Sequence, residues 1–307
     1  MTSTPHHFNL MVTSDSAYVP LVAALLASVH KFLPDEMMLE VYWLHVDNAQ
    51  ESREQLANFC KHSLPRCKLH ISTFDTLPSS VQKKVEILIG NNDSSWGPAL
   101  CFAAPFVLPM ILPTSVRRAV FVDADVIALG DISELATIPL DGLPAGCVRA
   151  PLKMFNRRLG LQRYCNSGVV AIDVEAWRNE GVSEAAIEYL YKISGSWGVN
   201  FPDQDALNVT LADSMGQAKW KELPPKWNAC SPLYTKPRWR LLYDPTPIND
   251  VKLLHYCGAK PWGTVPASLL GRIARRKGIQ FGPTKPAHPH AALFFEALAD
   301  TPFKAPR

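Results

Sequence analysis

AVFVDADVIAL, residues Ala119–Leu129, is apolar throughout except for Asp123 and Asp125. A continuous apolar run is typical of a strand in a parallel sheet that helices cover on both faces. Such a strand brings its last residues to the carboxyl edge of the sheet, where open α/β folds bind their ligands. The stretch therefore predicts an α/β fold with two carboxylates at the end of a central strand.

Strand-like and helix-like segments alternate on either side of this run. The other expected strands are 8–13, 39–46, 68–74, 146–149, 168–172 and 251–255. The expected helices are 19–32, 49–62, 174–178 and 203–211. Alternation of this kind indicates βαβ units. We therefore expect a single, mostly parallel central sheet flanked by helices.

The composition is that of an ordinary globular protein, with 47% apolar and 19% charged residues among 307. A formal net charge of +3 is too small to indicate a nucleic-acid partner. The charge is uneven, because residues 263–307 carry +5 and residues 1–262 carry −2. We place a soft boundary after Trp262, between a main domain and a basic, aromatic C-terminal segment.

Seven cysteines are scattered along the chain, and no two of them form a Cys-x-x-Cys pair. An odd number without paired spacing favours reduced thiols over a disulfide framework or a structural zinc site. The first residues, MTSTPHHFNL, lack the basic and apolar regions of a signal peptide. No stretch has the length of a membrane span. We therefore expect a cytoplasmic protein.

Asp123 and Asp125 are candidate ligands for a divalent cation. Carboxylates two residues apart converge on one ion when the chain kinks at the end of a strand, and the ion then bridges to diphosphate oxygens. The alternative is that both are turn or cap residues, and the pair alone does not decide between the two. His255 follows a late strand, and its imidazole would favour Mn²⁺ over Ca²⁺. Lys260 would balance a diphosphate, unless it is a solvated lysine.

Other polar residues follow expected strands or open expected helices. A nucleobase would stack on Tyr18 and bond to Asp15, although for these two residues taken alone a helix cap beside a packed aromatic is the preferred explanation. Asn166 stands at a strand entrance, where asparagine is usually a turn former. Asp203 and Gln204 open a helix, where Asp203 would be an N-cap or, with Gln204, a ligand for sugar hydroxyls.

The order of these motifs decides between the alternatives. The series is Asp15-x-x-Tyr18, FVDADVIALGDISEL, YCNSGVVAIDVEAWR, FPDQDALN and LLHYCGAKPW. It resembles glycosyltransferase family 8 over roughly residues 8–262, a family that includes bacterial lipopolysaccharide galactosyl- and glucosyltransferases and the glycogenins. The resemblance implies a GT-A catalytic domain over residues 1–262, a UDP-sugar donor and retention at the anomeric carbon.

The same resemblance assigns roles to individual residues. It implies Mn²⁺ held by Asp123, Asp125 and His255. It matches Asp15 and Tyr18 to the uracil-binding positions, and Asp123, Gly258 and Lys260 to contacts with the nucleotide diphosphate. Asn166, Asp203 and Gln204 match catalytic positions around the donor sugar.

The expected reaction is transfer of galactose or glucose from a UDP-hexose to a glycan or glycolipid acceptor, such as a lipopolysaccharide. Retention requires either a covalent glycosyl intermediate or attack on the same face. Asp203 and Gln204 are the nearest candidates for a nucleophile, but glutamine is a weak one, which favours same-face attack. Self-glucosylation on a tyrosine, as in glycogenins, is a further alternative for the acceptor.

The sequence departs from the family pattern at three points. Pro105 stands where the family usually has an Arg facing the donor, and Ala150 where it usually has an Asp. His255 and Lys260 are five residues apart, whereas six is more usual. A catalytically impaired UDP-sugar-binding relative is therefore one alternative. A DxD phosphohydrolase is another, although such motifs want Thr or Val where Ile127 stands.

The C-terminal segment combines basic and apolar residues, as a segment resting on an anionic membrane leaflet would. The set is Leu269, Leu270, Arg272, Ile273, Arg275, Arg276, Lys277, Ile279, Phe281, Phe294, Phe295 and Phe303. Peripheral contact with the inner face of a membrane is one expectation. The other, slightly favoured, is that the helical spacing of Leu269, Leu270 and Ile273 packs this segment on the main domain.

Overall fold

A seven-stranded sheet forms the centre of the computed structural model, which describes residues 7–90, 99–150, 158–193, 201–235, 245–268 and 283–305. Its strands are β1 (His7–Ser14), β2 (Met38–His45), β3 (Cys67–Thr73), β4 (Arg118–Val122), β6 (Ala145–Arg149), β7 (Cys165–Asp173) and β8 (Lys221–Leu223). Their order is β3-β2-β1-β4-β7-β6-β8. Only β7 runs antiparallel to its neighbours in this sheet. The predicted mostly parallel central sheet is therefore confirmed.

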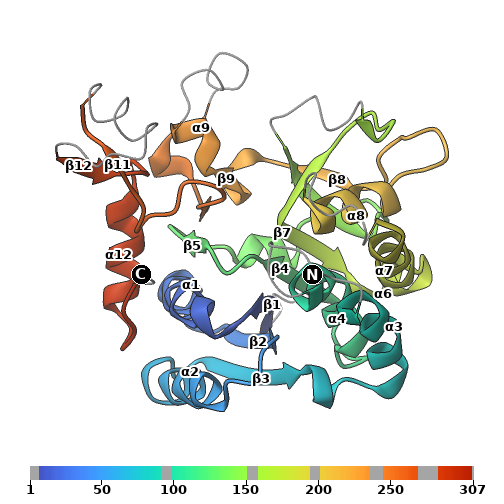
Figure 1. Cartoon of the computed structure of the whole chain (residues 1–307), viewed down its shortest axis with the longest axis horizontal. Helices are drawn as coiled ribbons and strands as arrows, with labels where there is room; N and C mark the ends of the chain where they lie inside the picture. The colour runs from blue at the N-terminus through green and yellow to red at the C-terminus, as the bar shows by residue number, and fades with distance from the viewer. Residues whose placement is uncertain are drawn as a thin grey trace.

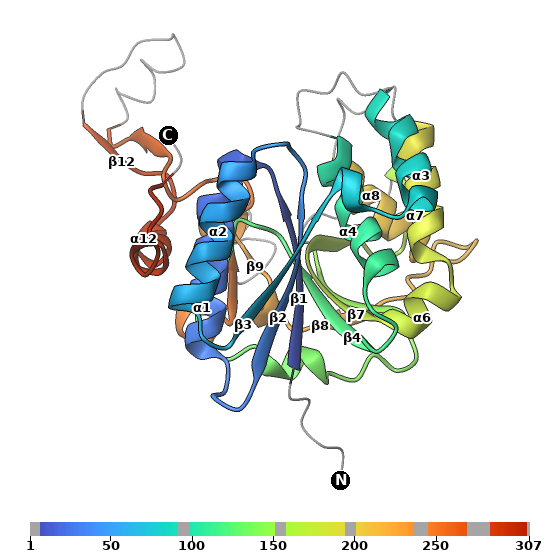
Figure 2. The same cartoon turned by 90° about the horizontal axis from the view of Figure 1, so that it is seen from below.

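Helices cover both faces of this sheet, as Figure 2 shows. One face carries α1 (Val19–Phe32) and α2 (Gln50–Ser63). The other carries α3 (Ser79–Gly90), α4 (Ala99–Ile111), α6 (Val174–Asn179), α7 (Val182–Ile193) and α8 (Pro202–Thr210). The remaining helical elements are η1 (Ser16–Tyr18), η2 (Phe74–Thr76), η3 (Ser133–Ala136), η5 (Pro225–Trp227), η6 (Ile248–Asp250), α9 (Ser231–Thr235) and α12 (Ala291–Ala299).

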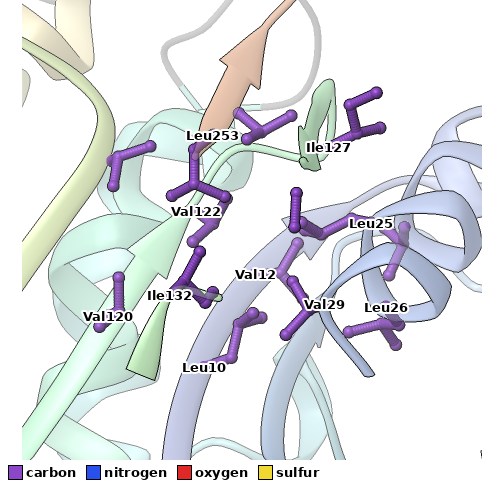
Figure 3. Packing of buried hydrophobic residues seen from close by; sticks show 14 of the residues in the cluster. Leu10, Val12, Leu25, Leu26, Val29, Val120, Val122, Ile127, Ile132 and Leu253 are labelled. Atoms are coloured by element: carbon purple, nitrogen blue, oxygen red, sulfur yellow. The ribbon is translucent and has the colours of Figure 1, made fainter. Parts of the chain in front are cut away.

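The alternation of side chains along each strand builds two cores. In β1, Leu10 and Val12 point toward α1, whereas Met11 packs on the opposite side with α4. Strand β4 follows the same rule, since successive side chains of a strand face opposite sides of the sheet. Figure 3 shows Leu10, Val12, Val120 and Val122 in the same apolar cluster as Leu25, Leu26 and Val29 of α1. Burial on both faces explains why these strands are continuously apolar.

The run Ala119–Leu129 is not one strand. Strand β4 ends at Val122, and the chain turns through Asp123-Ala124-Asp125, with Val126 N donating to Asp123 O at 3.2 Å. Strand β5 (Val126–Ala128) then joins a separate small sheet with β10 (Leu253–His255) and β9 (Ala229–Cys230). A two-stranded sheet of β11 (Thr264–Pro266) and β12 (Thr284–Pro286) is a further addition to the predicted architecture. The kink places both aspartates between two sheets.

Helix α12 packs on α1, beside which Figure 1 shows it. Phe294 and Leu298 of α12 are buried in the same core as β1 and α1. Leu269, Leu270, Arg272, Ile273, Arg275, Arg276, Lys277, Ile279 and Phe281 lie outside the described residues. Among the residues that the structure describes, no helix has the length and apolar character to cross a membrane.

Candidate active site

Three segments converge where the central sheet meets the small sheet. Asp123 follows β4 directly, and its backbone N–H donates to Gly168 O of β7 at 2.8 Å. Asp125 precedes β5, and its carbonyl accepts from Tyr256 N at 2.9 Å. His255 ends β10, opposite Val126 of β5. The backbone pairing of both sheets therefore fixes the positions of all three predicted ligands.

The side chains of Asp123, Asp125 and His255 point at a common centre. His255 Nε2 lies 3.5 Å from Asp123 Oδ2 and 3.3 Å from Asp125 Oδ1. One candidate ligand atom from each residue lies within 4.8 Å of the other two. Lys260 Nζ forms an ion pair with Asp125 Oδ2. The geometry therefore brings together the predicted ligands and the predicted diphosphate contact.

The two carboxylates differ in electrostatic environment. Burial raises the pKa of Asp123 to about 7, an effect that the nearby Asp125 increases and His255 opposes. Burial acts in the same direction on Asp125, but Lys260 and His255 together hold the pKa of that carboxyl well below its usual value. A buried carboxylate with a raised pKa is one that a further cation would stabilise in its charged form.

Gly168 tests whether these residues fit a bound cation. A Cβ built at Gly168 would lie 2.2 Å from His255 Cε1 and 2.7 Å from Asp123 Oδ2. Any side chain at residue 168 would therefore displace a ligand, so that the glycine keeps this side of the cluster open. Two carboxylates and one imidazole are a donor set that suits Mn²⁺ and other divalent transition metals. The residues present therefore fit such an ion.

Asn228 connects the cluster of Asp123, Asp125 and His255 to the predicted sugar-binding residues. His255 Nδ1 lies 2.9 Å from Asn228 Oδ1, which makes Nδ1 the donor and leaves Nε2 to face the carboxylates. Asn228 Nδ2 donates to Asn166 Oδ1 at 2.7 Å, and Asn166 Nδ2 donates to Gln204 Oε1 at 2.9 Å. These four residues form one hydrogen-bonded line that fixes the orientation of the imidazole.

Asn228 is not among the site residues that the sequence predicts. It lies in the stretch PPKWNAC, which reads as a structured loop dense in Pro and Trp. The sequence feature that points to Asn228 is its amide side chain directly between Trp227 and the apolar pair Ala229–Cys230. A polar side chain within a buried run requires a hydrogen-bond partner. Gly168 and Ser167 were likewise not among the predicted site residues.

Asp203 lies beside this line. It is in the first turn of α8 rather than at its N-cap, which is Phe201, so the alternative of an N-cap does not hold. Ser167 Oγ donates to Asp203 Oδ2 at 2.9 Å, while Ser167 N donates to Gln204 Oε1 at 3.3 Å. Burial raises the pKa of Asp203, and the Ser167 hydroxyl partly offsets that effect.

The predicted base-binding residues stand at the end of β1. Asp15 caps η1, and its Oδ1 accepts from Tyr18 N at 3.1 Å, as the alternative of a helix cap anticipates. The ring of Tyr18 is 36% exposed rather than packed in a core. Lys260 Nζ lies 5.9 Å from its centroid, so this ring lies next to the group of Asp123, Asp125 and His255 with which Lys260 is paired. Gly258 is exposed with φ of +92°, a conformation that favours glycine.

Helix α4 forms another wall of the site. Burial of Cys101 in α4 is the main cause that raises the pKa of its thiol to about 12. The negative charges of nearby carboxylates add to this effect, and they belong to Asp15, Asp47, Asp123 and Asp203. Pro105 and Pro109 lie inside this helix, and Pro105 adjoins Ser167 at a small apolar cavity. Ala150 is buried and donates its backbone N–H to Tyr164 O. Neither position of family departure carries a charged side chain.

Comparisons with known proteins show the family of the chain. The family model described as "Glycosyl transferase family 8" matches residues 9–265. The general stress protein A of Bacillus subtilis is 30% identical over 167 residues, which cover 50% of this chain and 56% of that protein. The lipopolysaccharide 1,2-glucosyltransferase of Escherichia coli is 31% identical over 165 residues, covering 50% and 46%. The chain spans about half the length of the curated relatives it matches.

A solved structure shows the same fold. The galactosyltransferase LgtC, crystallised with donor and acceptor sugar analogues, aligns with a TM-score of 0.67 at 17% identity. The alignment covers 97% of both chains. The GT-A fold expected from the sequence is thereby confirmed.

Proposed function

The chain belongs to glycosyltransferase family 8, and on this basis we propose that it is a metal-dependent, retaining hexosyltransferase with a UDP-sugar donor. The observation that carries the proposal is the cluster of Asp123, Asp125 and His255 with Lys260 at its edge. The cluster lies beside the Asn166–Gln204 hydrogen bond at one end of the central sheet. A cation and a cationic side chain together suit a diphosphate leaving group.

The leaving group is stabilised from two sides in this proposal. Manganese held by the two carboxylates and His255 Nε2 would neutralise charge on the diphosphate oxygens as UDP departs. Lys260 is paired with Asp125. A diphosphate offers Lys260 further anionic oxygens at the same place, and a flexible ammonium reaches them by rotation of its side chain. Asp15 and Tyr18 hold the uracil.

We favour attack by the acceptor on the same face of the sugar that UDP leaves. The carbonyl oxygen of Gln204 already accepts bonds from Asn166 and Ser167, which holds it in place and opposes its use as a nucleophile. Asp203 Oδ2 accepts from the Ser167 hydroxyl. Asp203, Gln204 and Asn166 then serve to orient the donor sugar and to stabilise positive charge at its anomeric carbon.

The acceptor in this proposal is a glycan or a glycolipid. One relative is a lipopolysaccharide glucosyltransferase, and another is a lipopolysaccharide 1,3-galactosyltransferase. Galactose and glucose are therefore the first donors to examine. Residues 1–262 would supply the catalytic unit. The contact between α12 and α1 supports packing, rather than membrane contact, as the role of α12.

A donor screen tests the proposal. The protein is incubated with MnCl₂ and each of several UDP-hexoses, and hydrolysis or transfer is followed by mass spectrometry. We expect turnover of UDP-galactose or UDP-glucose that excess EDTA abolishes. Binding of UDP without turnover of any donor would identify an impaired relative, for which the uncharged Pro105 and Ala150 would be the first explanation. Full turnover in EDTA would contradict the metal site.

A further inference from the structure

Two thiols lie beside His255, in addition to the two carboxylates that face its Nε2. Asn228 Oδ1 is 2.9 Å from His255 Nδ1 and 3.6 Å from Cys230 Sγ. Cys257 follows His255 by two residues, and its thiol lies within hydrogen-bonding reach of the Cys230 thiol, both cysteines being free. Strand pairing places Cys230 of β9 opposite His255 of β10. The buried thiol of Cys230 and the half-buried thiol of Cys257 therefore lie beside the imidazole, and Cys230 shares Asn228 Oδ1 with His255 Nδ1.

These three side chains form a second set of metal ligands. One donor atom each from Cys230, Cys257 and His255 lies within 4.8 Å of the others. A tetrahedral zinc ion holds sulfur at about 2.3 Å and nitrogen at about 2.0–2.1 Å, so that its ligand atoms stand roughly 3.5–4 Å apart. Small rotations of the two cysteine side chains bring the donor atoms from within 4.8 Å of one another to the separation that zinc requires. Asn228 Oδ1 is a further oxygen donor at the same place.

We propose that Cys230, Cys257 and His255 Nδ1 bind a thiophilic divalent cation such as Zn²⁺ or Cd²⁺. Each thiol releases its proton to solvent on coordination, and the two thiolates neutralise the charge of the ion in its buried site. Imidazole and thiolate are the ligands that such ions prefer, whereas Mn²⁺ prefers oxygen. Half-buried Cys257 and exposed Gly258 give the ion a route from solvent.

The proposed ion opposes binding of the catalytic cation, a consequence that rests on the proposed function. A neutral imidazole has one lone pair on nitrogen, so coordination at Nδ1 places the ring proton on Nε2. That N–H then points at Asp123 Oδ2 and Asp125 Oδ1, which lie 3.5 and 3.3 Å away. His255 thus serves one cation at a time, and the thiophilic ion withdraws it from the carboxylate site.

Cadmium chloride is the probe for the thiol site, because thiolate coordination gives Cd²⁺ an ultraviolet charge-transfer band. The test titrates wild type, Cys230→Ser, Cys257→Ser and the control Cys67→Ser. Cys67 forms a thiol pair with Cys60, and neither belongs to a metal-ligand group among the described residues.

We expect both site variants to weaken the tightest Cd²⁺ binding by more than the about 10–100-fold cost of losing an outer-shell partner. The control should bind as wild type. Thermal unfolding checks that each variant is folded. Equal tight binding in wild type and both site variants would overturn the proposal.

Competition between the two cations is tested by measuring bound Mn²⁺ through its electron paramagnetic resonance signal. In wild type, Cd²⁺ should release bound Mn²⁺ at a concentration about tenfold or more below that required by Cys257→Ser. Equal concentrations would overturn the opposition. A protein that binds no Mn²⁺ even without Cd²⁺ would count against the proposed function, and the cadmium titration alone would then decide the thiol site.

Discussion

The residue with the most direct part in the proposed chemistry is Asp125, since it contacts both His255 and Lys260. Asp125→Asn keeps the shape of the side chain but removes its charge. We expect donor turnover to fall far more than tenfold, because each factor of ten corresponds to about 1.4 kcal/mol and a metal-bridged leaving group supplies several. The measurement is the rate of UDP release at saturating Mn²⁺.

Asp131→Asn is the matched control for this change. Asp131 is an exposed aspartate that caps the turn at Ser133, away from the cluster. It should retain wild-type turnover. If Asp125→Asn were as active as this control, the carboxylate would have no part in the reaction.

Asn228 acts on the metal only through His255, which makes it a positioning residue. Asn228→Ala removes the acceptor for Nδ1–H and the donor to Asn166. We expect Mn²⁺ affinity to fall about 10–100-fold, as it does when an outer-shell partner is lost. Asn249→Ala, at an exposed position in η6, is the control. Unchanged Mn²⁺ affinity in folded Asn228→Ala would show that the bond to His255 is structural only.

At the scale of elements, the sequence predicts best where local signals and tertiary structure agree. The expected helix 19–32 coincides with α1, because Leu33-Pro34 ends the helix there. The split of 119–129 into β4 and β5 was not predicted, since both halves are equally apolar but belong to different sheets. Helix α7 was overlooked, although Val182, Ala186, Ile187 and Leu190 have helical spacing.

The candidate site likewise has residues that the sequence predicts and residues that it does not. Asp15 and Asp123 each follow a strand of the central sheet, so the α/β pattern alone brings them to its carboxyl edge. His255 is the last residue of β10 in the small sheet, and its pairing with β5 brings it to the same place. Asn228 and Asn166 are 62 residues apart in sequence, and no local periodicity encodes their contact. Short motifs therefore predict the ligands, while the bonds that orient them emerge only from the tertiary structure.

The segment between β12 and α12 contains a buried titratable group. His288 is fully buried; its Nδ1 accepts from His290 N at 3.1 Å, and its Nε2 has no hydrogen-bond partner among the residues that the structure describes. Burial, with a smaller effect of His290, lowers the pKa of His288 from 6.5 to about 4. Because the unfolded chain binds this proton more readily, the free energy of unfolding should fall as pH drops from about 6.5 to 4.

Urea unfolding at pH 7 and pH 5 measures this effect. His288→Asn keeps an oxygen near the position of Nδ1 but cannot be protonated. Its free energy of unfolding should change less between the two pH values than that of wild type. An identical change in both proteins would assign the acid sensitivity to other groups.

At the scale of the whole molecule, the C-terminal segment reaches the candidate site through aromatic contacts. The Phe294 ring lies 5.9 Å from that of Tyr256 and 5.5 Å from that of Trp262. These two residues flank the Cys257–Pro261 loop that carries Lys260. Tyr256 OH also donates to His290 O at 2.9 Å. Helix α12 therefore braces the loop that holds the diphosphate contact.

Adjacent phenylalanines in α12 separate the two expectations for the tail. Phe294 is 1% exposed and Phe295 is 42% exposed. If the segment is a structural cover, Phe294→Ala should lower the free energy of unfolding by about 3–5 kcal/mol, and Phe295→Ala should change it by about 0.5 kcal/mol or less. Urea unfolding of both variants measures this.

If the segment instead rests on a membrane, wild type should sediment with anionic vesicles at low salt, where the attraction is strongest. Phe295→Ala should then reduce that binding, whereas a protein that ignores such vesicles, together with the expected loss in Phe294→Ala, would leave packing as the role of α12.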